Sequence, residues 1–146
     1  MANSCRAAAL LAGHGPRLQE QAFAYGRHVG LAFQLVDDVL DFEQPAATLG
    51  KPALHDLRNG LATAPVLLAA RRFPQEVAAL TARKFRGEGD VERALELVER
   101  SGGLQQAKDL ALVQAEMAME AVLPLAPSPA RDGLIQLASL AVNRTK

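Results

Sequence analysis

The feature that most constrains the fold is an apolar stretch, Gly30–Phe42, which carries three carboxylates at Asp37, Asp38 and Asp41. On a helix, at about 100° per residue, these carboxylates fall in one arc about 100° wide. The same arc holds the few other polar or small residues nearby, Arg27, Gly30 and Gln34. Apolar side chains fill the rest of the circumference, so the helix should be buried on most sides. The acidic stripe must therefore face a cavity, a cation or water.

The three carboxylates destabilise such a helix in two ways. Asp37 and Asp41 are like charges four residues apart, and Asp38 and Asp41 are three apart, which is mildly unfavourable. All three fall near the expected helix C-terminus, where the macrodipole disfavours anions. A hard cation, Mg²⁺ or Ca²⁺, bound by carboxylate oxygens would explain the cluster. A solvated acidic helix end is the alternative.

Composition narrows the class of protein further. The chain has 146 residues, of which 49% are hydrophobic and 4% aromatic, as expected for one Ala- and Leu-rich helical domain. Sixteen basic and sixteen acidic residues cancel, so nothing suggests a nucleic-acid partner. No apolar run approaches the roughly 18 residues of a membrane span. Cys5 is the single cysteine, which excludes an intrachain disulfide and predicts a buried structural thiol.

The hydrophobic periodicity predicts an all-α fold, because helical patterns alternate with Gly and Pro breaks and no strand pattern occurs. The expected helices are 3–12, 17–42, 62–72, 75–85, 91–100, 104–123 and 129–142. Segment 50–60 is polar and shows little helical periodicity. Pro74 should end one helix, Asp90 should cap the helix that follows it, and Ser128 should cap the last. Gly26, inside the long helix, either leaves space for a ligand or permits close helix packing.

Several other metal sites fit poorly. An EF-hand loop needs oxygen ligands at alternating positions and a Gly at the sixth, whereas this run has Val39 and Phe42 at such positions. There is no Glu-x-x-His pair of a di-iron bundle and no His-Glu-x-x-His zinc motif. Downstream, Lys51 and Arg58 supply cations for an anionic substrate. A diphosphate suits this combination, because Mg²⁺ binds through a few carboxylates plus substrate phosphates.

These residues resemble a known family. Gly30-x-x-Phe-Gln-Leu-x-Asp-Asp-Val-Leu-Asp-Phe42, followed by Gly50-Lys-Pro52 and Gly60-Leu-Ala-Thr-x-Pro-Val66, is similar to motifs of the trans-isoprenyl diphosphate synthases. The similarity continues through Gly89-Asp-Val91 and Ser128-Pro-x-Arg-Asp132, and it covers essentially the whole chain. It points to the long-chain branch that includes subunit 1 of the decaprenyl and solanesyl diphosphate synthases.

The resemblance implies an all-α isoprenoid-synthase bundle in which two aspartate-rich motifs hold Mg²⁺ on an allylic diphosphate. Asp37, Asp38 and Asp41 would be the second motif and the metal ligands. Asp37, Asp38 and Lys51 would be catalytic, and Gln34, Lys51 and Arg58 would contact substrate. Leu61 stands where many relatives have Lys, so no diphosphate contact is assigned there.

The resemblance also implies substrates, partners and a location. The substrates would be isopentenyl diphosphate and farnesyl or geranylgeranyl diphosphate, and the product would form the prenyl tail of ubiquinone in mitochondria. A second synthase subunit or a second copy would be the partner. The family's first aspartate motif lies upstream of the region that Ala2 resembles. Residues 1–146 are therefore expected to be a single partial domain, the C-terminal portion of a synthase, inactive alone.

Two alternatives remain open. The chain could be a truncated, non-catalytic isoform or helical interaction module that pairs with synthase subunits. It could also be an unrelated Ca²⁺-binding helical domain, which the loop spacing disfavours. A purely regulatory module has no need for three carboxylates on one stripe, so their presence favours catalytic ancestry.

Overall fold

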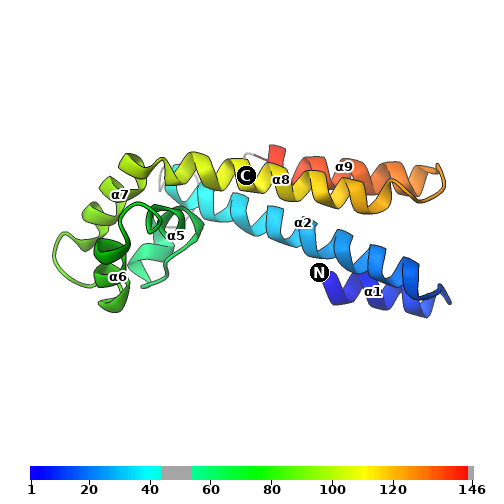
Figure 1. The fold of residues 1–146 in the computed structure, drawn as a ribbon, viewed down its shortest axis with the longest axis horizontal. Helices are drawn as coiled ribbons and strands as arrows, with labels where there is room; N and C mark the ends of the chain where they lie inside the picture. The colour runs from blue at the N-terminus through cyan, green and yellow to red at the C-terminus, as the bar shows by residue number, and fades with distance from the viewer. Residues whose placement is uncertain (44–53, 145–146) are drawn as a thin grey trace. The chain divides into compact units, whose positions relative to one another are not determined.

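The computed structural model describes residues 1–43 and 54–144, and all regular elements in these ranges are helices (Figure 1). This confirms the all-α prediction. The helices are α1 (Ala2–Leu11), α2 (Pro16–Glu43), α4 (His55–Arg58), α5 (Ala64–Ala69), α6 (Pro74–Ala82), α7 (Asp90–Ser101), α8 (Gly103–Val122) and α9 (Pro129–Asn143).

The chain divides into two compact units. Among the described residues, the first unit comprises Met1–Val36 and 110–144, and the second comprises 37–43 and 54–109. The unit boundaries fall inside α2 and α8. That residues 1–146 form a single partial domain stays a prediction.

Prolines set several helix starts. Pro16, Pro74 and Pro129 each begin a helix, where the missing N–H removes no intrahelical hydrogen bond. At α9 the Ser128 side chain accepts a hydrogen bond from the Arg131 N–H at 3.2 Å, which confirms the predicted cap. The prediction that Pro74 ends the preceding helix was wrong, because Pro74 is the first residue of α6.

Three further local predictions needed correction. The helix expected over 62–72 is only α5, because Thr63 is extended at φ −91° and ψ 178° and the helix ends at Ala69. Segment 50–60 includes one short helix, α4. Gly89, in the left-handed region at φ 75°, is the N-cap of α7, whereas Asp90 is its first helical residue.

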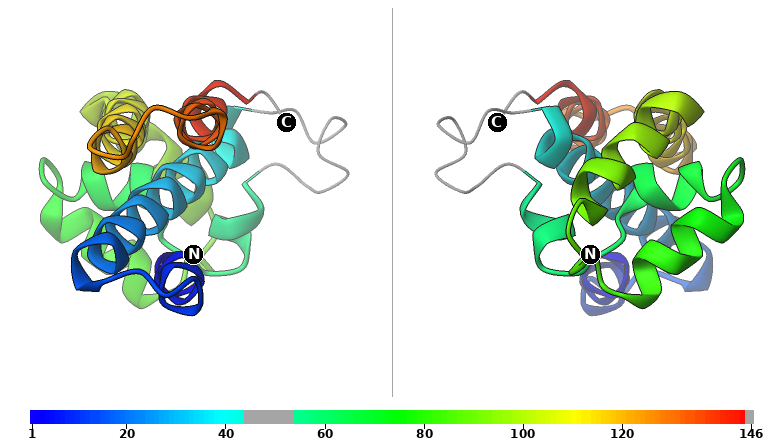
Figure 2. Two further views of the ribbon diagram at one scale, coloured as in Figure 1. Left: turned by 90° about the vertical axis from the view of Figure 1, so that its right-hand side faces the viewer. Right: turned by 90° about the vertical axis from the view of Figure 1, so that its left-hand side faces the viewer.

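The first unit has its own core. Buried Tyr25 and Val29 of α2 meet Ala118 and Val122 of α8 and Ala138 of α9. In Figures 1 and 2, α9 lies beside the C-terminal part of α8, and α1 lies beside α2.

Gly26 shows why α1 can approach α2 so closely. A Cβ at position 26 would lie 2.7 Å from Cys5 Sγ and 2.9 Å from the Met1 backbone oxygen. The structure therefore favours close helix packing over space for a ligand at this glycine.

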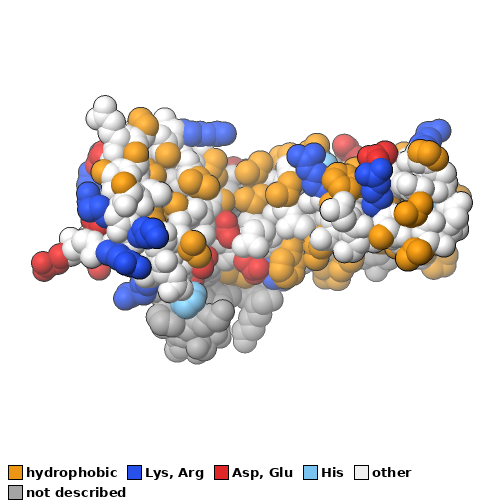
Figure 3. Space-filling view, turned by 90° about the horizontal axis from the view of Figure 1, so that it is seen from below, with side chains coloured by type: hydrophobic (Ala, Val, Ile, Leu, Met, Phe, Trp, Pro, Cys, Tyr) orange, Lys and Arg blue, Asp and Glu red, His pale blue; other side chains and the backbone are white. Residues whose placement is uncertain are grey.

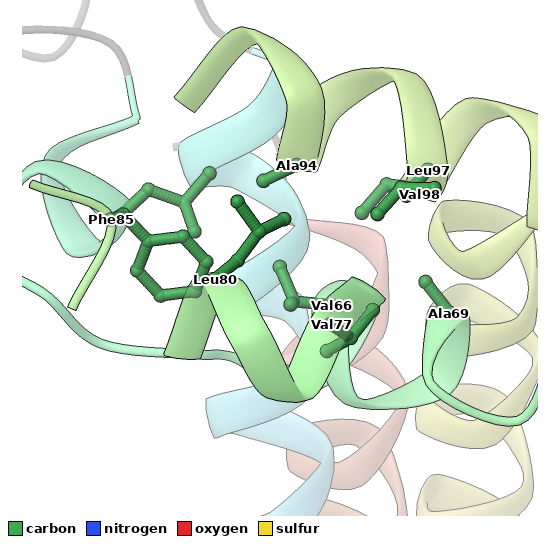
Figure 4. Close-up of a cluster of buried hydrophobic side chains, with 9 residues drawn as sticks. Val66, Ala69, Val77, Leu80, Phe85, Ala94, Leu97 and Val98 are labelled. Carbon is green, nitrogen blue, oxygen red and sulfur yellow. The ribbon is translucent and has the colours of Figure 1, made fainter. Parts of the chain in front are cut away.

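The second unit has a separate core, shown in Figure 4. Nine buried side chains from α4 to α7 and the turn after α6 form it: Leu57, Val66, Ala69, Val77, Leu80, Phe85, Ala94, Leu97 and Val98. Gly103, the first residue of α8, lies against the Pro65 backbone oxygen, which a Cβ would approach to 2.4 Å. This contact requires glycine at the start of α8.

The first unit leaves several large apolar side chains exposed. Leu11 is 88% exposed, and Leu10 and Leu140 are 59% and 64% exposed. In Figure 3, which shows one face, hydrophobic side chains (orange) lie at the surface among charged and polar groups. Within the described ranges, none of the helices combines the length and the apolar character needed to cross a membrane.

Candidate active site

The acidic stripe lies in the last two turns of α2, which ends at Glu43. Asp37 and Asp41 are half-buried, and Asp38 is only 8% exposed. All three belong to the second unit. A carboxylate as buried as Asp38 needs hydrogen-bond donors, because a buried polar group without partners is costly.

Asp41 binds the N-terminus of α4. Its Oδ1 atom accepts a hydrogen bond from the His55 N–H at 3.0 Å, and its Oδ2 atom accepts one from the Asp56 N–H at 3.2 Å. The backbone oxygen of Asp41 also accepts a hydrogen bond from the Leu54 N–H at 3.2 Å. Leu54 itself has φ 59°, a left-handed conformation that is costly for leucine and needs support from neighbouring contacts. One residue of α2 thus fixes the start of α4.

Asp38 binds the N-terminus of α5 in the same way. Its Oδ2 atom accepts a hydrogen bond from the Ala64 N–H at 3.0 Å, and Ala64 is the first residue of α5. Thr63, at the N-cap position, makes no side-chain capping bond. Its hydroxyl oxygen is buried and has no hydrogen-bond partner among the described residues. Asp38 therefore supplies an acceptor for the first backbone amide of α5, which has no acceptor within its own helix.

These contacts explain how α2 tolerates the stripe. Amide groups at a helix N-terminus carry partial positive charge, which stabilises a nearby carboxylate. Each such cap is worth about 1 kcal/mol in typical helices. The hydrogen bonds to Asp38 and Asp41 thus offset the like-charge repulsion and the unfavourable position near the C-terminus of α2. Backbone amides and a cation are two compatible explanations for the same carboxylates.

The other predicted site residues lie at different places. Gln34 is exposed on α2, in the first unit. Arg58 is exposed at the last position of α4, the short helix whose first turn Asp41 binds. Lys51 lies outside the described residues. In the described part of the chain, no group of three or more His, Cys, Asp or Glu side chains is arranged to hold a metal ion. Metal binding and the roles of all these residues stay predictions.

Sequence reasoning missed the donors at this site, the backbone amides of His55, Asp56 and Ala64. The Thr-x-Pro pattern does predict a helix start near Ala64, because Pro65 fits a first-turn position, and the structure confirms that position. That pattern carries no information about which carboxylate faces the amide. Sequence reasoning also missed the ion pair between Glu43 and Lys108, at 2.6 Å, which links the end of α2 to α8.

A separate apolar cavity of about 350 Å³ lies in the first unit. α1, α2, α8 and α9 line it, with the Tyr25 and Leu134 side chains in its wall. The Tyr25 hydroxyl donates a hydrogen bond to the Leu134 backbone oxygen at 2.9 Å, and burial, followed by the nearby Cys5, raises the Tyr25 pKa. The lining includes none of the predicted site residues.

Known proteins match both the sequence and the fold. The family model for polyprenyl synthetase matches residues 1–98, a range that includes all three stripe aspartates. A probable mitochondrial hexaprenyl pyrophosphate synthase of Neurospora crassa is 48% identical over 146 residues, which is 100% of this chain and 32% of the relative. The human all trans-polyprenyl-diphosphate synthase is 46% identical over 146 residues, again 100% of this chain and 35% of the relative.

Solved structures agree with these sequence matches. The apo form of an Arabidopsis medium/long-chain length prenyl pyrophosphate synthase matches with a TM-score of 0.86 and 39% identity, over 99% of this chain and 50% of that one. A polyprenyl synthase of Caulobacter crescentus, complexed with calcium and isoprenyl diphosphate, matches with a TM-score of 0.81 and 38% identity, over 99% of this chain and 45% of that one. The chain thus spans about a third of the length of the curated relatives above and about half of the solved chains.

Proposed function

The chain belongs to the polyprenyl synthetase family, and on that premise we propose that residues 1–146 supply the diphosphate-binding aspartates of a long-chain prenyl diphosphate synthase. The complete reaction would join isopentenyl diphosphate to an allylic diphosphate, such as farnesyl or geranylgeranyl diphosphate. The product would serve as the prenyl tail of ubiquinone. Because relatives from fungi and plants are named as mitochondrial enzymes, we propose the same location.

The observation that carries this proposal is the fixed geometry of the acidic stripe. Asp38 and Asp41 are held by three backbone amides of α4 and α5. Rigid carboxylates can bind a cation with little reorganisation, which is the property that makes preorganised charged groups effective in catalysis. A solvated acidic helix end would not require such anchors.

The chemistry of these carboxylates suits Mg²⁺ that is shared with a diphosphate, since among the described residues they do not form a metal-binding group by themselves. Asp37, Asp38 and Asp41 offer carboxylate oxygens, the ligands that hard cations prefer, and Mg²⁺ in substrate complexes needs only one or two of them beside the phosphates. A carboxylate oxygen has two lone pairs, so an oxygen that accepts one amide hydrogen bond retains acceptor capacity. Support for a divalent ion also comes from the Caulobacter relative, whose structure contains calcium and isoprenyl diphosphate.

When bound, the metal would supply positive charge that stabilises the departing diphosphate. The chain's own residues would orient and neutralise that group. Lys51 and Arg58 follow the stripe in sequence, and Asp41 fixes the helix that carries Arg58. Arg58 and Lys51 would bind diphosphate oxygens with charge-assisted hydrogen bonds, and Gln34 would donate an amide hydrogen bond.

A chimera tests this function. Residues 1–146 would replace the matching segment of the Arabidopsis prenyl pyrophosphate synthase, which is 39% identical to this chain. We expect the chimera to incorporate labelled isopentenyl diphosphate into an allylic diphosphate in a Mg²⁺-dependent manner, and Asp37→Asn to abolish most of that activity. The 146-residue chain alone should show none. A folded chimera without Mg²⁺-dependent activity would refute the proposal.

A second candidate function is a helical interaction module that pairs with synthase subunits. The exposed leucines of the first unit, such as Leu11 and Leu140, favour it, because a partner could bury these apolar side chains. Light scattering of the purified chain, alone and mixed with a full-length synthase, would separate a second copy from a synthase subunit as the partner. A chain that stays monomeric under both conditions would exclude this candidate.

A further inference from the structure

Arg144, which follows α9, makes two contacts with Phe33 of α2. The guanidinium carbon of Arg144 lies 3.6 Å from the centroid of the Phe33 ring. Its Nη2 atom also donates a hydrogen bond to the Phe33 backbone oxygen at 2.7 Å. Both residues belong to the first unit. The end of α9 is thereby attached to one defined point on α2.

The chemistry of this pair is specific to arginine. A planar guanidinium can stack on an aromatic face and donate a hydrogen bond in its own plane at the same time. A lysine ammonium keeps the charge but lacks this flat, forked geometry. A bond from a charged donor is also stronger than one between neutral groups. The Arg144–Phe33 contact is therefore a directional attachment and not only a nearby charge.

The position of Phe33 gives the contact its significance. Phe33 directly precedes Gln34, and in a regular α-helix its backbone oxygen is the acceptor for the N–H of Asp37. The outer side of this stretch of α2 is open to solvent, since Leu31 is 42% exposed and Phe33 is 38% exposed. Side chains this exposed make few buried contacts, so packing alone restrains the motion of this turn only weakly. An attachment at Phe33 limits the motion of the turn that leads into the stripe.

We propose that Arg144 is a positioning residue for the diphosphate site, because it fixes the turn of α2 that carries Gln34 and leads into Asp37. The inference rests on the proposed function. Arg144 would act through Phe33 and not by touching the diphosphate. It was not among the site residues expected from the sequence.

Calorimetric titration of the 146-residue chain with inorganic pyrophosphate in the presence of Mg²⁺ tests the proposal. Arg144→Ala should weaken the Mg²⁺-dependent affinity by roughly fivefold. Arg144→Lys should lower the affinity almost as much as Arg144→Ala does, because lysine keeps the positive charge but cannot stack on the Phe33 ring. Phe33→Leu should have an intermediate effect, since it removes the ring and keeps the backbone oxygen. Arg6→Ala is the matched control, because Arg6 pairs with Glu20 in the same unit and also loses one positive charge.

A spectroscopic readout accompanies the titration. The Cδ protons of Arg144 should show an upfield ring-current shift that disappears in Phe33→Leu, and thermal unfolding would confirm that each variant is folded. Wild-type affinity in Arg144→Ala, or an equal loss in Arg6→Ala, would overturn the positioning role. If the wild-type chain shows no Mg²⁺-dependent binding, the proposed function fails and the role of Arg144 fails with it. The ring-current shift would still report whether the Phe33 contact forms.

Discussion

The Oδ2 atom of Asp38 accepts a hydrogen bond from the backbone N–H of Ala64, a residue 26 positions later in the chain. This bond joins the last turns of α2 to the first residue of α5. Together with the two amide bonds to Asp41, it makes the acidic stripe an attachment point for the following segment. The stripe therefore contributes to folding as well as to the proposed chemistry, and the two contributions can be separated by experiment.

Asp38→Ala should lower the free energy of unfolding by about 1–3 kcal/mol, because it removes an acceptor and leaves the Ala64 N–H without a partner. Urea unfolding of the 146-residue chain would measure the change. Asp109→Ala is the control, because Asp109 is exposed and accepts a surface hydrogen bond from Gln105. Its effect should stay within about 0.5 kcal/mol. Equal stability of the two variants would contradict the anchoring role of Asp38.

Asp37→Asn should reduce Mg²⁺-dependent binding of pyrophosphate, since the amide keeps the shape of the side chain and loses its charge. We expect a loss of at least tenfold, typical of removing a ligand charge from a cation site. Calorimetry on the 146-residue chain, with thermal unfolding measured in parallel, would quantify it. Asp109→Asn is again the control, and unchanged binding in a folded Asp37→Asn chain would remove Asp37 from the site.

Asp41→Asn should loosen the start of α4. An Asn side chain has one carbonyl oxygen, so only one of the His55 and Asp56 N–H groups would keep its acceptor. Amide hydrogen exchange measured by NMR should become faster at one or both of these residues. The Val66 N–H, which bonds to the Thr63 backbone oxygen, should keep its exchange rate. Faster exchange at Val66 but not at His55 or Asp56 would argue against the anchor.

Asp90 should make stability depend on pH. A hydrogen bond from Arg83, supported by the Gly87 N–H and opposed by burial, lowers the pKa of the Asp90 carboxyl. The folded chain therefore binds this proton more weakly than the unfolded chain, whose Asp pKa is about 3.9. The contribution is present above about pH 4 and is lost as the pH falls through the folded-state pKa.

Urea midpoints at pH 5 and pH 3 would test this linkage. The wild-type chain should lose more stability between the two pH values than Asp90→Asn does. Arg83→Gln should flatten the dependence in the same way, because it removes the largest cause of the lowered pKa. Parallel pH profiles for all three chains would show that Asp90 does not contribute.

Gly26→Ala should weaken the attachment of α1 to α2, because the new Cβ would lie 2.7 Å from Cys5 Sγ and 2.9 Å from the Met1 backbone oxygen. Overpacking of this kind costs about 1–3 kcal/mol. Cys5 is the only cysteine in the sequence, so its rate of reaction with a thiol reagent reports directly on α1. The rate should rise in Gly26→Ala. In Gly133→Ala, where a Cβ has nothing within 4 Å, it should not.

Local sequence determined much of this protein. Apolar periodicity and the scarcity of strand patterns gave the all-α class, and Ser128 with Pro129 gave the start of α9. The angular spacing of Asp37, Asp38 and Asp41 on one helix follows from the 3.6-residue repeat alone. The motifs around the stripe also identified the family that the family model confirms. These features depend on residues that are close together in the chain, and so they can be inferred from it.

Only the tertiary structure decided what the stripe faces. The partners of Asp41 and Asp38 are amides 14 to 26 residues away, and no local pattern encodes a contact over that separation. α4 escaped prediction because four residues cannot sustain a helix by themselves; Asp41 and the packing of buried Leu57 stabilise it. The contact of Arg144 with Phe33 spans 111 positions. Long-range hydrogen bonds and packing fixed these features, because they form only when distant segments meet.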